Sequence, residues 1–379
     1  MVKTFKTLDI IVNKIYKQNE CRENMTKKIC FFTTTFSSHE QVRLSYAEKY
    51  FPPEVQLFLL TPHSQNKYNL NRTKIIEPPE NKIKFIFHLR RFCKKNNIDL
   101  LLNLGTYKEV YASFLATIFS RTKFIINEHR DIINYPKLRT NFLFRFIDRI
   151  DQFFVFTMYH FSKSVVLGAK DQAEELRKYL FLMKQKIYCL PLIIDEKIFD
   201  IKNKTKTRKK LHLPLKKDIL IFVGRISYLK GSDILYDLAK QNPDKIFLLA
   251  GNELDKTFSE KKLKNVILLG SKGPEELADY YAASDLSILP SKIEGFGLVS
   301  RESMLCGTPA LVSNILALKS IPNAIISENT AKDMQIKINE FFSIPLKQRE
   351  KNSKKLREAI VNETSYDKLK EKYLEIFYK

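Results

Sequence analysis

The chain has 379 residues, 44% of them hydrophobic, which is long enough for two α/β domains with separate cores. Its 65 Lys and Arg exceed its 42 Asp and Glu, but unevenly: residues 1–150 hold 26 basic and 13 acidic side chains, and residues 251–350 hold 12 and 13. The charge predicts that the first half attracts anionic surfaces, whereas no motif of interleaved basic and aromatic residues indicates nucleic-acid binding.

Residues 1–27 carry a helical pattern. On a helical wheel, lysines fall within an arc of about 80° opposite an apolar face. The lysines are Lys3, Lys6, Lys14 and Lys17, and the apolar residues are Phe5, Leu8, Ile11, Val12, Ile15 and Tyr16. Two interpretations stay open: a helix lying on an anionic membrane surface, or a helix packed on the first domain. The phenylalanine-rich stretch 141–156 is a second candidate for a membrane surface and is too interrupted by charge to span a bilayer.

Strand-like runs alternate with helical stretches along residues 28–199. The expected strands are Lys28–Thr35, Val55–Leu60, Asp99–Leu104, Lys123–Asn127 and Ser164–Leu167. This alternation predicts a parallel sheet with helices on both faces. Glu128, His129 and Arg130 follow one of these strands, where ionisable groups can face a cleft between domains. A structural role is the alternative: Glu128 and Arg130 would form an ordinary ion pair, and His129 would be a loop histidine whose hydrogen bonds are made within the protein.

Residues 200–362 show the same alternation of strands and helices. They begin with a lysine-rich stretch, Ile201–Lys217, which marks the boundary between the two domains. The expected strands are Asp218–Val223, Lys245–Ala250, Val266–Leu269, Leu286–Leu289 and Ala310–Val312. The fold class is therefore α/β, with two Rossmann-like domains. A helix from about Tyr366 within residues 363–379 is expected to cross back to the first domain.

Arg225 and Lys230 follow the apolar run Asp218–Val223 and precede a helix that opens at Ser232 or Asp233. Open α/β sheets bind phosphate at this position, between the carboxyl end of a strand and a helix N-terminus. Arginine binds a phosphate through two parallel hydrogen bonds, and lysine adds a compact charge. Taken alone, Lys-Gly is also a common end of a helix.

Glu294 and Glu302 are separated by eight positions, with Gly295, Phe296, Gly297 and Leu298 between them. A single helix would rotate the second acid about 80° from the first, so a loop must intervene for the two to converge. The two glycines supply such a loop, followed by a short helix over residues 300–306. Strand, glycine loop and helix N-terminus in this order form a pocket for an anionic, hydroxyl-rich ligand. A Glu-x7-Glu pair by itself arises often by chance.

Five spaced elements in residues 218–313 together resemble the C-terminal half of the retaining GT-B glycosyltransferases of group 1. They are Gly224-Arg225 with Lys230-Gly231, Gly270, Ser284-Asp285 with Pro290-Ser291, Glu294-x7-Glu302, and Gly307-Thr308-Pro309. The resemblance implies the GT-B fold, in which two parallel sheets face each other across a cleft. The segment Pro191–Asp195 resembles the family's interdomain stretch, with Leu192 and Ile193 in place of Asn-Gly.

The resemblance also implies roles. Arg225 and Lys230 correspond to positions that hold the donor diphosphate, and Glu302 to the position that holds the ribose hydroxyls. Glu294 corresponds to the residue beside the reacting carbon of the donor sugar, and the loop Gly295–Leu298 to the segment that meets sugar and phosphates. His129 is expected to act in catalysis, and Glu128 and Arg130 to contact the sugar or the acceptor. No metal or other cofactor is expected.

These observations predict a cytoplasmic, peripherally membrane-bound retaining glycosyltransferase. Its donor is expected to be a nucleotide sugar such as a UDP-sugar, and its acceptor a lipid-linked or surface glycan, as in lipopolysaccharide or capsule assembly. The five scattered cysteines and the lack of a leader-like apolar run in the first residues favour the cytoplasm. A nucleotide-sugar 2-epimerase on the same fold is the alternative enzyme, and a basic nucleic-acid-binding protein is the non-enzymatic alternative.

Overall fold

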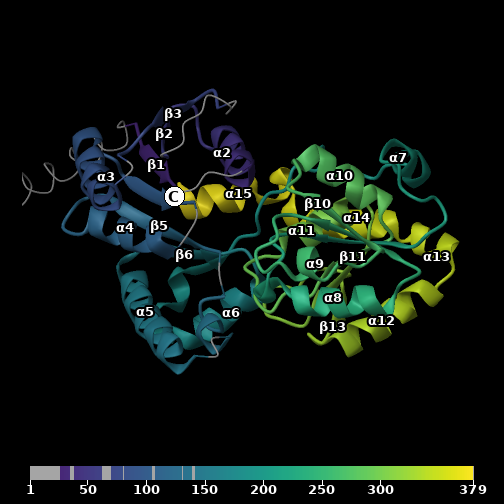
Figure 1. The fold of residues 1–379 in the computed structure, drawn as a ribbon. Coiled ribbons are helices and arrows are strands. Elements are labelled where there is room, and N and C mark those ends of the chain that lie inside the picture. Colours follow the sequence, from purple (N-terminus) through teal and green to yellow (C-terminus); the bar gives the residue numbers. More distant parts are fainter. Residues whose placement is uncertain are drawn as a thin grey trace, which may run out of the picture.

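The structure is a computed structural model, and it describes residues 26–34, 38–61, 70–79, 81–104, 107–129, 131–138 and 141–378. The predicted helix over residues 1–27 lies outside the described residues, except for Thr26 and Lys27. Two α/β bodies stand side by side, each built on its own sheet (Figure 1). No helix among the described residues is both long and apolar enough to cross a bilayer.

The first sheet contains seven parallel strands among the residues described, in the order β3-β2-β1-β4-β5-β6-β7. The strands are β1 (Lys28–Phe32), β2 (Gln56–Leu60), β3 (Thr73–Ile76), β4 (Leu100–Asn103), β5 (Lys123–Glu128), β6 (Ser164–Leu167) and β7 (Ile187–Cys189). The helices around it are α2 (Ser38–Tyr50), α3 (Lys82–Asn96), α4 (Tyr107–Thr117), α5 (Phe142–Phe161) and α6 (Lys170–Tyr179), with short turns η1 (Tyr135–Leu138) and η2 (Phe181–Lys186). Continuous apolar strands such as β6 are buried on both faces, as parallel strands between helix layers require.

The second sheet has six parallel strands in the described chain, in the order β10-β9-β8-β11-β12-β13. They are β8 (Ile219–Val223), β9 (Ile246–Ala250), β10 (Val266–Gly270), β11 (Leu286–Leu289), β12 (Ala310–Ser313) and β13 (Ile325–Ser327). Its helices are α7 (Lys204–Lys210), η3 (Tyr228–Lys230), α8 (Ser232–Gln241), α9 (Thr257–Glu260), α10 (Pro274–Ala283), α11 (Leu298–Leu305), α12 (Ala331–Ser343), α13 (Leu346–Lys351) and α14 (Ser353–Thr364). The predicted α/β architecture with two parallel sheets is confirmed.

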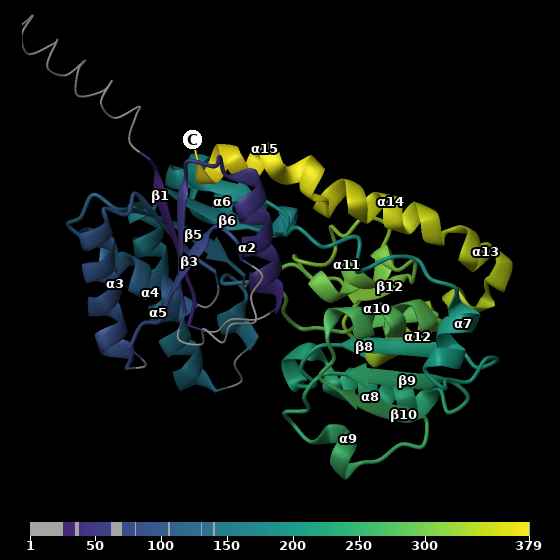
Figure 2. The same ribbon diagram turned by 90° about the horizontal axis from the view of Figure 1, so that it is seen from above.

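The last helix, α15 (Tyr366–Phe377), leaves the second body and lies on the first (Figure 2). Its apolar side belongs to the core cluster that also contains β1, β2 and β4. Tyr366 stacks on Tyr46 of α2 with ring centroids 5.2 Å apart, and the Tyr373 hydroxyl donates to the Pro191 carbonyl over 2.9 Å. These contacts tie the end of the chain to the first sheet.

Candidate active site at the junction of the two sheets

Strands β8 and β11 are parallel neighbours, so the loops that follow them leave the same edge of the second sheet. The backbone N–H of Lys292 donates to the Leu229 carbonyl over 2.9 Å. Gly231 has φ 78°, and a Cβ added there would lie 2.2 Å from the Pro290 carbonyl oxygen. Only glycine permits this approach, and the two loops are therefore held against each other.

Lys230 and Glu294, predicted from separate motifs, meet where these two loops touch. The Lys230 ammonium lies 2.5 Å from Glu294 Oε1, and the Ser291 hydroxyl donates to the same oxygen over 2.9 Å. Both side chains are largely shielded, with exposed fractions of 21% and 13%. The carboxylate is thus fixed in position by a charged donor and a neutral donor.

Arg225 follows β8 directly and is exposed. Among the described residues it has no ion-pair partner, whereas Lys230 has Glu294. Gly224, with φ 142°, precedes it, and a Cβ on the adjacent Gly251 would lie 2.0 Å from the Gly224 carbonyl oxygen. This close backbone approach fixes the start of the loop and leaves a guanidinium at the sheet edge.

Glu302 lies in the interior of α11 and is only 1% exposed. The Tyr281 hydroxyl donates to its Oε2 over 3.2 Å, and burial raises the pKa of Glu302 to about 8. Glu302 is one of the residues that line a cavity between the two bodies, together with Arg43 of α2 and Leu298. Glu302 is therefore placed beside this interdomain cavity, which neither Lys230 nor Glu294 lines.

The loop after Glu294 is in direct contact with the first body. A Cβ at Gly295 would lie 1.9 Å from the His129 carbonyl oxygen, so a larger residue does not fit there. Gln172, at the start of α6, donates from Nε2 to the Glu294 carbonyl over 2.7 Å. The Gly295–Leu298 loop is thus held between the carboxyl ends of strands from both sheets.

His129 lies at the end of β5 with Nε2 2.9 Å from an Arg43 guanidinium nitrogen. Burial, together with the positive charge of Arg43, lowers the pKa of His129 to about 3, so the imidazole is neutral at physiological pH. Glu128 is buried and accepts a hydrogen bond from the Tyr159 hydroxyl over 2.7 Å. Arg130 lies outside the described residues.

Phe296 and Gly297 complete the loop in different ways. Phe296 is buried, and its ring lies 3.8 Å below the Arg301 guanidinium. Gly297 has φ 71°, and a Cβ there would lie 2.3 Å from the Leu318 side chain. The loop is therefore closely packed on its inner side.

Three residues at this junction were not predicted from the sequence: Gln172 and Arg301, which bond to the segment Glu294–Phe296, and Arg43, which contacts His129. Arg301 is fully buried and forms a two-pronged ion pair with Glu363 of α14, at 2.8 and 2.6 Å. Arg301 lies inside the Glu-x7-Glu motif, and a buried arginine is normally paired with an acid. Its position could therefore have indicated a buried ion pair. The contacts of Arg43 and Gln172 join segments that are distant in sequence, and no local sequence pattern predicts them.

In the part of the chain that the structure describes, no three His, Cys, Asp or Glu side chains gather closely enough to hold a metal ion.

Comparisons with known proteins agree with this geometry. Residues 203–360 match the family model "Glycosyl transferases group 1". The D-inositol 3-phosphate glycosyltransferase of Xylanimonas cellulosilytica is 27% identical over 177 residues, which cover 42% of this chain and 42% of that protein. The chain thus spans about two fifths of the length of this curated relative.

Two solved structures share the whole fold. Sucrose-phosphate synthase from Thermosynechococcus elongatus superposes with a TM-score of 0.78 at 16% identity, covering 93% of this chain and 98% of that one. Anabaena HepE (Alr3699), solved in complex with UDP and glucose, gives a TM-score of 0.74 at 14% identity, covering 92% and 98%. Over residues 203–360 the chain is similar to the group 1 glycosyl transferases, and the chain has the GT-B fold.

Proposed function

We propose that this protein is a retaining glycosyltransferase that moves a sugar from a nucleotide-diphosphate donor to a lipid-linked or surface-glycan acceptor. The observation that carries the proposal is the Lys230–Glu294 ion pair. It sits at the carboxyl edge of β8 and β11 and is joined to the end of β5 by the contact between Gly295 and His129. A carboxylate and cations at the junction of two α/β bodies suit a ligand with both hydroxyls and phosphates.

The donor diphosphate would bind to Arg225 and Lys230. Arg225 is exposed at the sheet edge, and its guanidinium can bind two phosphate oxygens at once. Lys230 has three N–H donors, so it can bind a phosphate while keeping its bond to Glu294. The start of α11 adds the positive end of a helix dipole to the same region.

The sugar would lie between Glu294 and His129. The bond between the anomeric carbon and the diphosphate oxygen breaks, and the diphosphate leaves with the bonding electrons. An acceptor hydroxyl oxygen bonds to the anomeric carbon, and its proton passes to the departing diphosphate. Glu294 would stabilise positive charge at the anomeric carbon, and Arg225 and Lys230 the negative charge on the leaving group. His129, neutral because its pKa is lowered to about 3, would act as a hydrogen-bonding residue beside the sugar or the acceptor.

The carboxyl of Glu302, one of the residues that line the interdomain cavity, is the proposed ligand for the ribose hydroxyls. The UDP bound to Anabaena HepE supports UDP as the donor nucleotide here. The basic first half supports an acceptor on an anionic surface, such as a lipid-linked glycan of lipopolysaccharide or capsule at the inner face of the cell membrane. We expect the reaction to need no metal ion.

The test is to incubate the protein with UDP-, GDP- or ADP-sugars labelled in the sugar, with and without a bacterial lipid extract. Transfer of label to the lipid fraction, lost in Glu294→Gln, is the expected result. Conversion of free donor in the absence of the extract would instead indicate the epimerase. Failure of every donor to react, in samples that bind DNA or RNA in a salt-dependent way, would overturn the proposal in favour of the nucleic-acid-binding alternative.

A further inference from the structure

Helix α5 is apolar on its exposed side as well as on its buried side. Its buried residues include Gln152, Val155 and Tyr159, which share one face. The opposite face, over an arc of about 120° at 100° per residue, is largely apolar, with Thr157 and His160 as its polar side chains. Its large apolar members are Phe142, Leu143, Phe146, Ile150, Phe153, Phe154 and Phe161, which we call the aromatic face of α5.

The polar groups of α5 are instead used inside the protein. Gln152 donates to the Ile132 carbonyl over 2.9 Å, and Arg149 donates to the Gln152 side chain over 2.9 Å. Asp151 accepts a hydrogen bond from the Tyr111 hydroxyl of α4 over 2.6 Å. The helix is thus anchored by hydrogen bonds on its inner side, and its outer side presents hydrocarbon.

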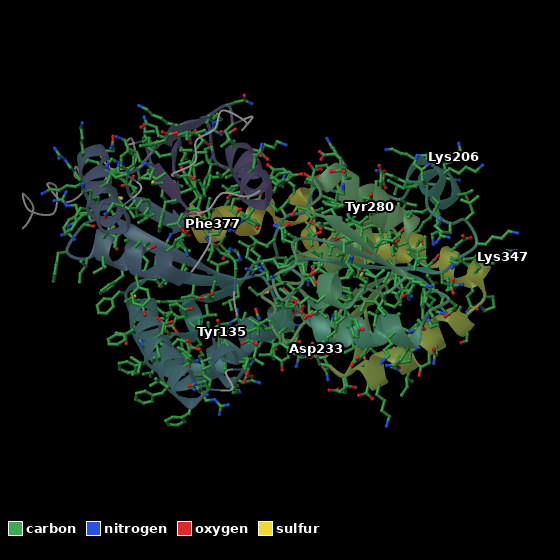
Figure 3. All side chains as sticks on the ribbon, viewed as in Figure 1. Tyr135, Lys206, Asp233, Tyr280, Lys347 and Phe377 are labelled. Carbon is green, nitrogen blue, oxygen red and sulfur yellow. The ribbon has the colours of Figure 1, made fainter. Side chains whose placement is uncertain are left out.

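The aromatic face is strongly exposed. Phe142 is 81% exposed, Phe153 68% and Phe161 64%. The helix forms an outer flank of the first body, and side chains extend from it on the side away from the second body (Figures 1 and 3). Monomeric proteins rarely expose a contiguous apolar surface of this kind unless it binds something.

We propose that the aromatic face of α5 is a membrane-docking surface, with the helix lying in the interface of a bilayer that contains anionic lipids. This goes beyond the proposed function, because it assigns a binding surface away from the donor site and its test needs no donor. Over its 20 residues the helix is about 30 Å long and presents its rings on one side, as an interfacial helix does.

Positive charge borders this surface. Arg149 lies beside one edge of the aromatic face by its helical position, and its guanidinium also donates to the Gln152 side chain. At the C-terminal end of the helix, Lys186 donates to the His160 carbonyl over 3.2 Å. The two acids of α5, Asp148 and Asp151, take positions on the inner half of the wheel. An anionic lipid surface therefore meets rings in the centre and cations at the edges.

These features favour a bilayer over a protein partner. A protein interface normally surrounds its apolar centre with polar groups that hydrogen-bond across to the partner. Along the centre of the aromatic face, Thr157 is the polar side chain within the described helix, and its hydroxyl donates to the Phe153 carbonyl over 2.9 Å. A row of exposed rings whose central hydroxyl is bonded within its own helix fits a fluid hydrocarbon boundary.

The surface is also connected to the proposed acceptor side. The chain passes from His129 through η1 into α5, and η1 packs against α5. The bond from Gln152 to the Ile132 carbonyl fixes the segment just after His129. Docking α5 on a bilayer would therefore bring the loop at the end of β5 close to the lipid surface, where a lipid-linked acceptor resides.

The chain contains no tryptophan, which permits a direct test. Phe153→Trp places a single fluorophore on the aromatic face, and Leu254→Trp places one at a position 60% exposed in the second body. The full chain is mixed with phosphatidylcholine vesicles, with or without phosphatidylglycerol, whose acyl chains are brominated. We expect blue-shifted, bromine-quenched emission for Phe153→Trp with phosphatidylglycerol, and no change for Leu254→Trp.

A second measurement is vesicle sedimentation of a triple variant, Phe142→Gln, Phe146→Gln and Phe153→Gln. Replacing exposed residues by a good helix former leaves the helix intact. Each half-buried ring contributes about fivefold to partitioning, so the triple variant should bind about 100-fold more weakly. The matched control replaces three exposed leucines of the second body by glutamine, namely Leu254, Leu268 and Leu346.

Vesicle binding without quenching of Phe153→Trp would overturn the proposal, because another segment, such as residues 1–27, would then carry the binding. The absence of vesicle binding would overturn it as well. A blue shift that depends on protein concentration without lipid would assign the aromatic face to a second copy of the chain instead. None of these results depends on glycosyl transfer.

Discussion

Replacing Glu302 by glutamine should stabilise the protein at neutral pH and not at acidic pH. The Glu302 carboxyl is buried, and its pKa is raised to about 8 from the ordinary 4.5, chiefly because burial removes it from water. Between these two values the unfolded chain releases the proton while the folded chain retains it. The folded state then binds more protons, so the free energy of unfolding falls as the pH rises through this window.

The size of the effect follows from the pKa shift. Each pKa unit of the shift corresponds to about 1.36 kcal/mol. Burial of the Glu302 carboxyl therefore lowers the free energy of unfolding by about 4 kcal/mol at about pH 7.5, and by less than about 1 kcal/mol at about pH 5. Glutamine has no proton to lose, and its carbonyl oxygen can still accept the hydrogen bond from Tyr281. The free energy of unfolding of Glu302→Gln, relative to that of wild type, should therefore rise by about 3 kcal/mol from about pH 5 to about pH 7.5.

Urea unfolding of both proteins at a series of pH values measures this difference. Glu358→Gln, on the exposed side of α14, controls for the loss of one carboxyl. A constant difference between Glu302→Gln and wild type from about pH 5 to about pH 8 would refute the reasoning, as would a variant less stable than wild type at every pH.

Three further substitutions test the loop itself. Glu294→Gln should lower turnover about 100-fold while donor affinity, measured by calorimetry, changes little, because this acid acts mainly in the transition state. Gly295→Ala places a Cβ 1.9 Å from the His129 carbonyl oxygen, so steady-state activity should fall below a tenth while the circular dichroism spectrum stays native; full activity would contradict the contact. Arg301→Met breaks the buried pair with Glu363 and should cost about 3 kcal/mol in denaturant unfolding; an unchanged midpoint would show that the pair is dispensable.

The sequence predicted the architecture well wherever strands are central and apolar. Ser164–Leu167 and Leu286–Leu289 appear in the structure with the predicted bounds. The strands β3, β7 and β13 were not predicted, and none of them is a fully buried apolar run. Each of them is the last strand at one edge of its sheet, where burial on both faces no longer demands a long apolar run.

The candidate site was predictable as a set of residues, but only partly as a geometry. The α/β pattern predicted parallel sheets, and the strand order of the structure brings Lys230 to Glu294 because β8 and β11 are neighbours. The contacts of Glu302 with Tyr281, and of His129 with Arg43, join positions 21 and 86 residues apart, so they depend on the packing of separate helices. The roles of these residues in catalysis and donor binding stay predictions.

The most direct test of the central claim is nucleotide binding at the edge of the second sheet. UDP, GDP and ADP are each added to wild type, Arg225→Ala and Lys230→Met, and the stability of the protein is measured. At about 100 times its dissociation constant, one of the three should stabilise wild type by about 2.7 kcal/mol. Both variants should lose most of that gain. No stabilisation by any of the three nucleotides, or equal stabilisation of wild type and both variants, would contradict the account.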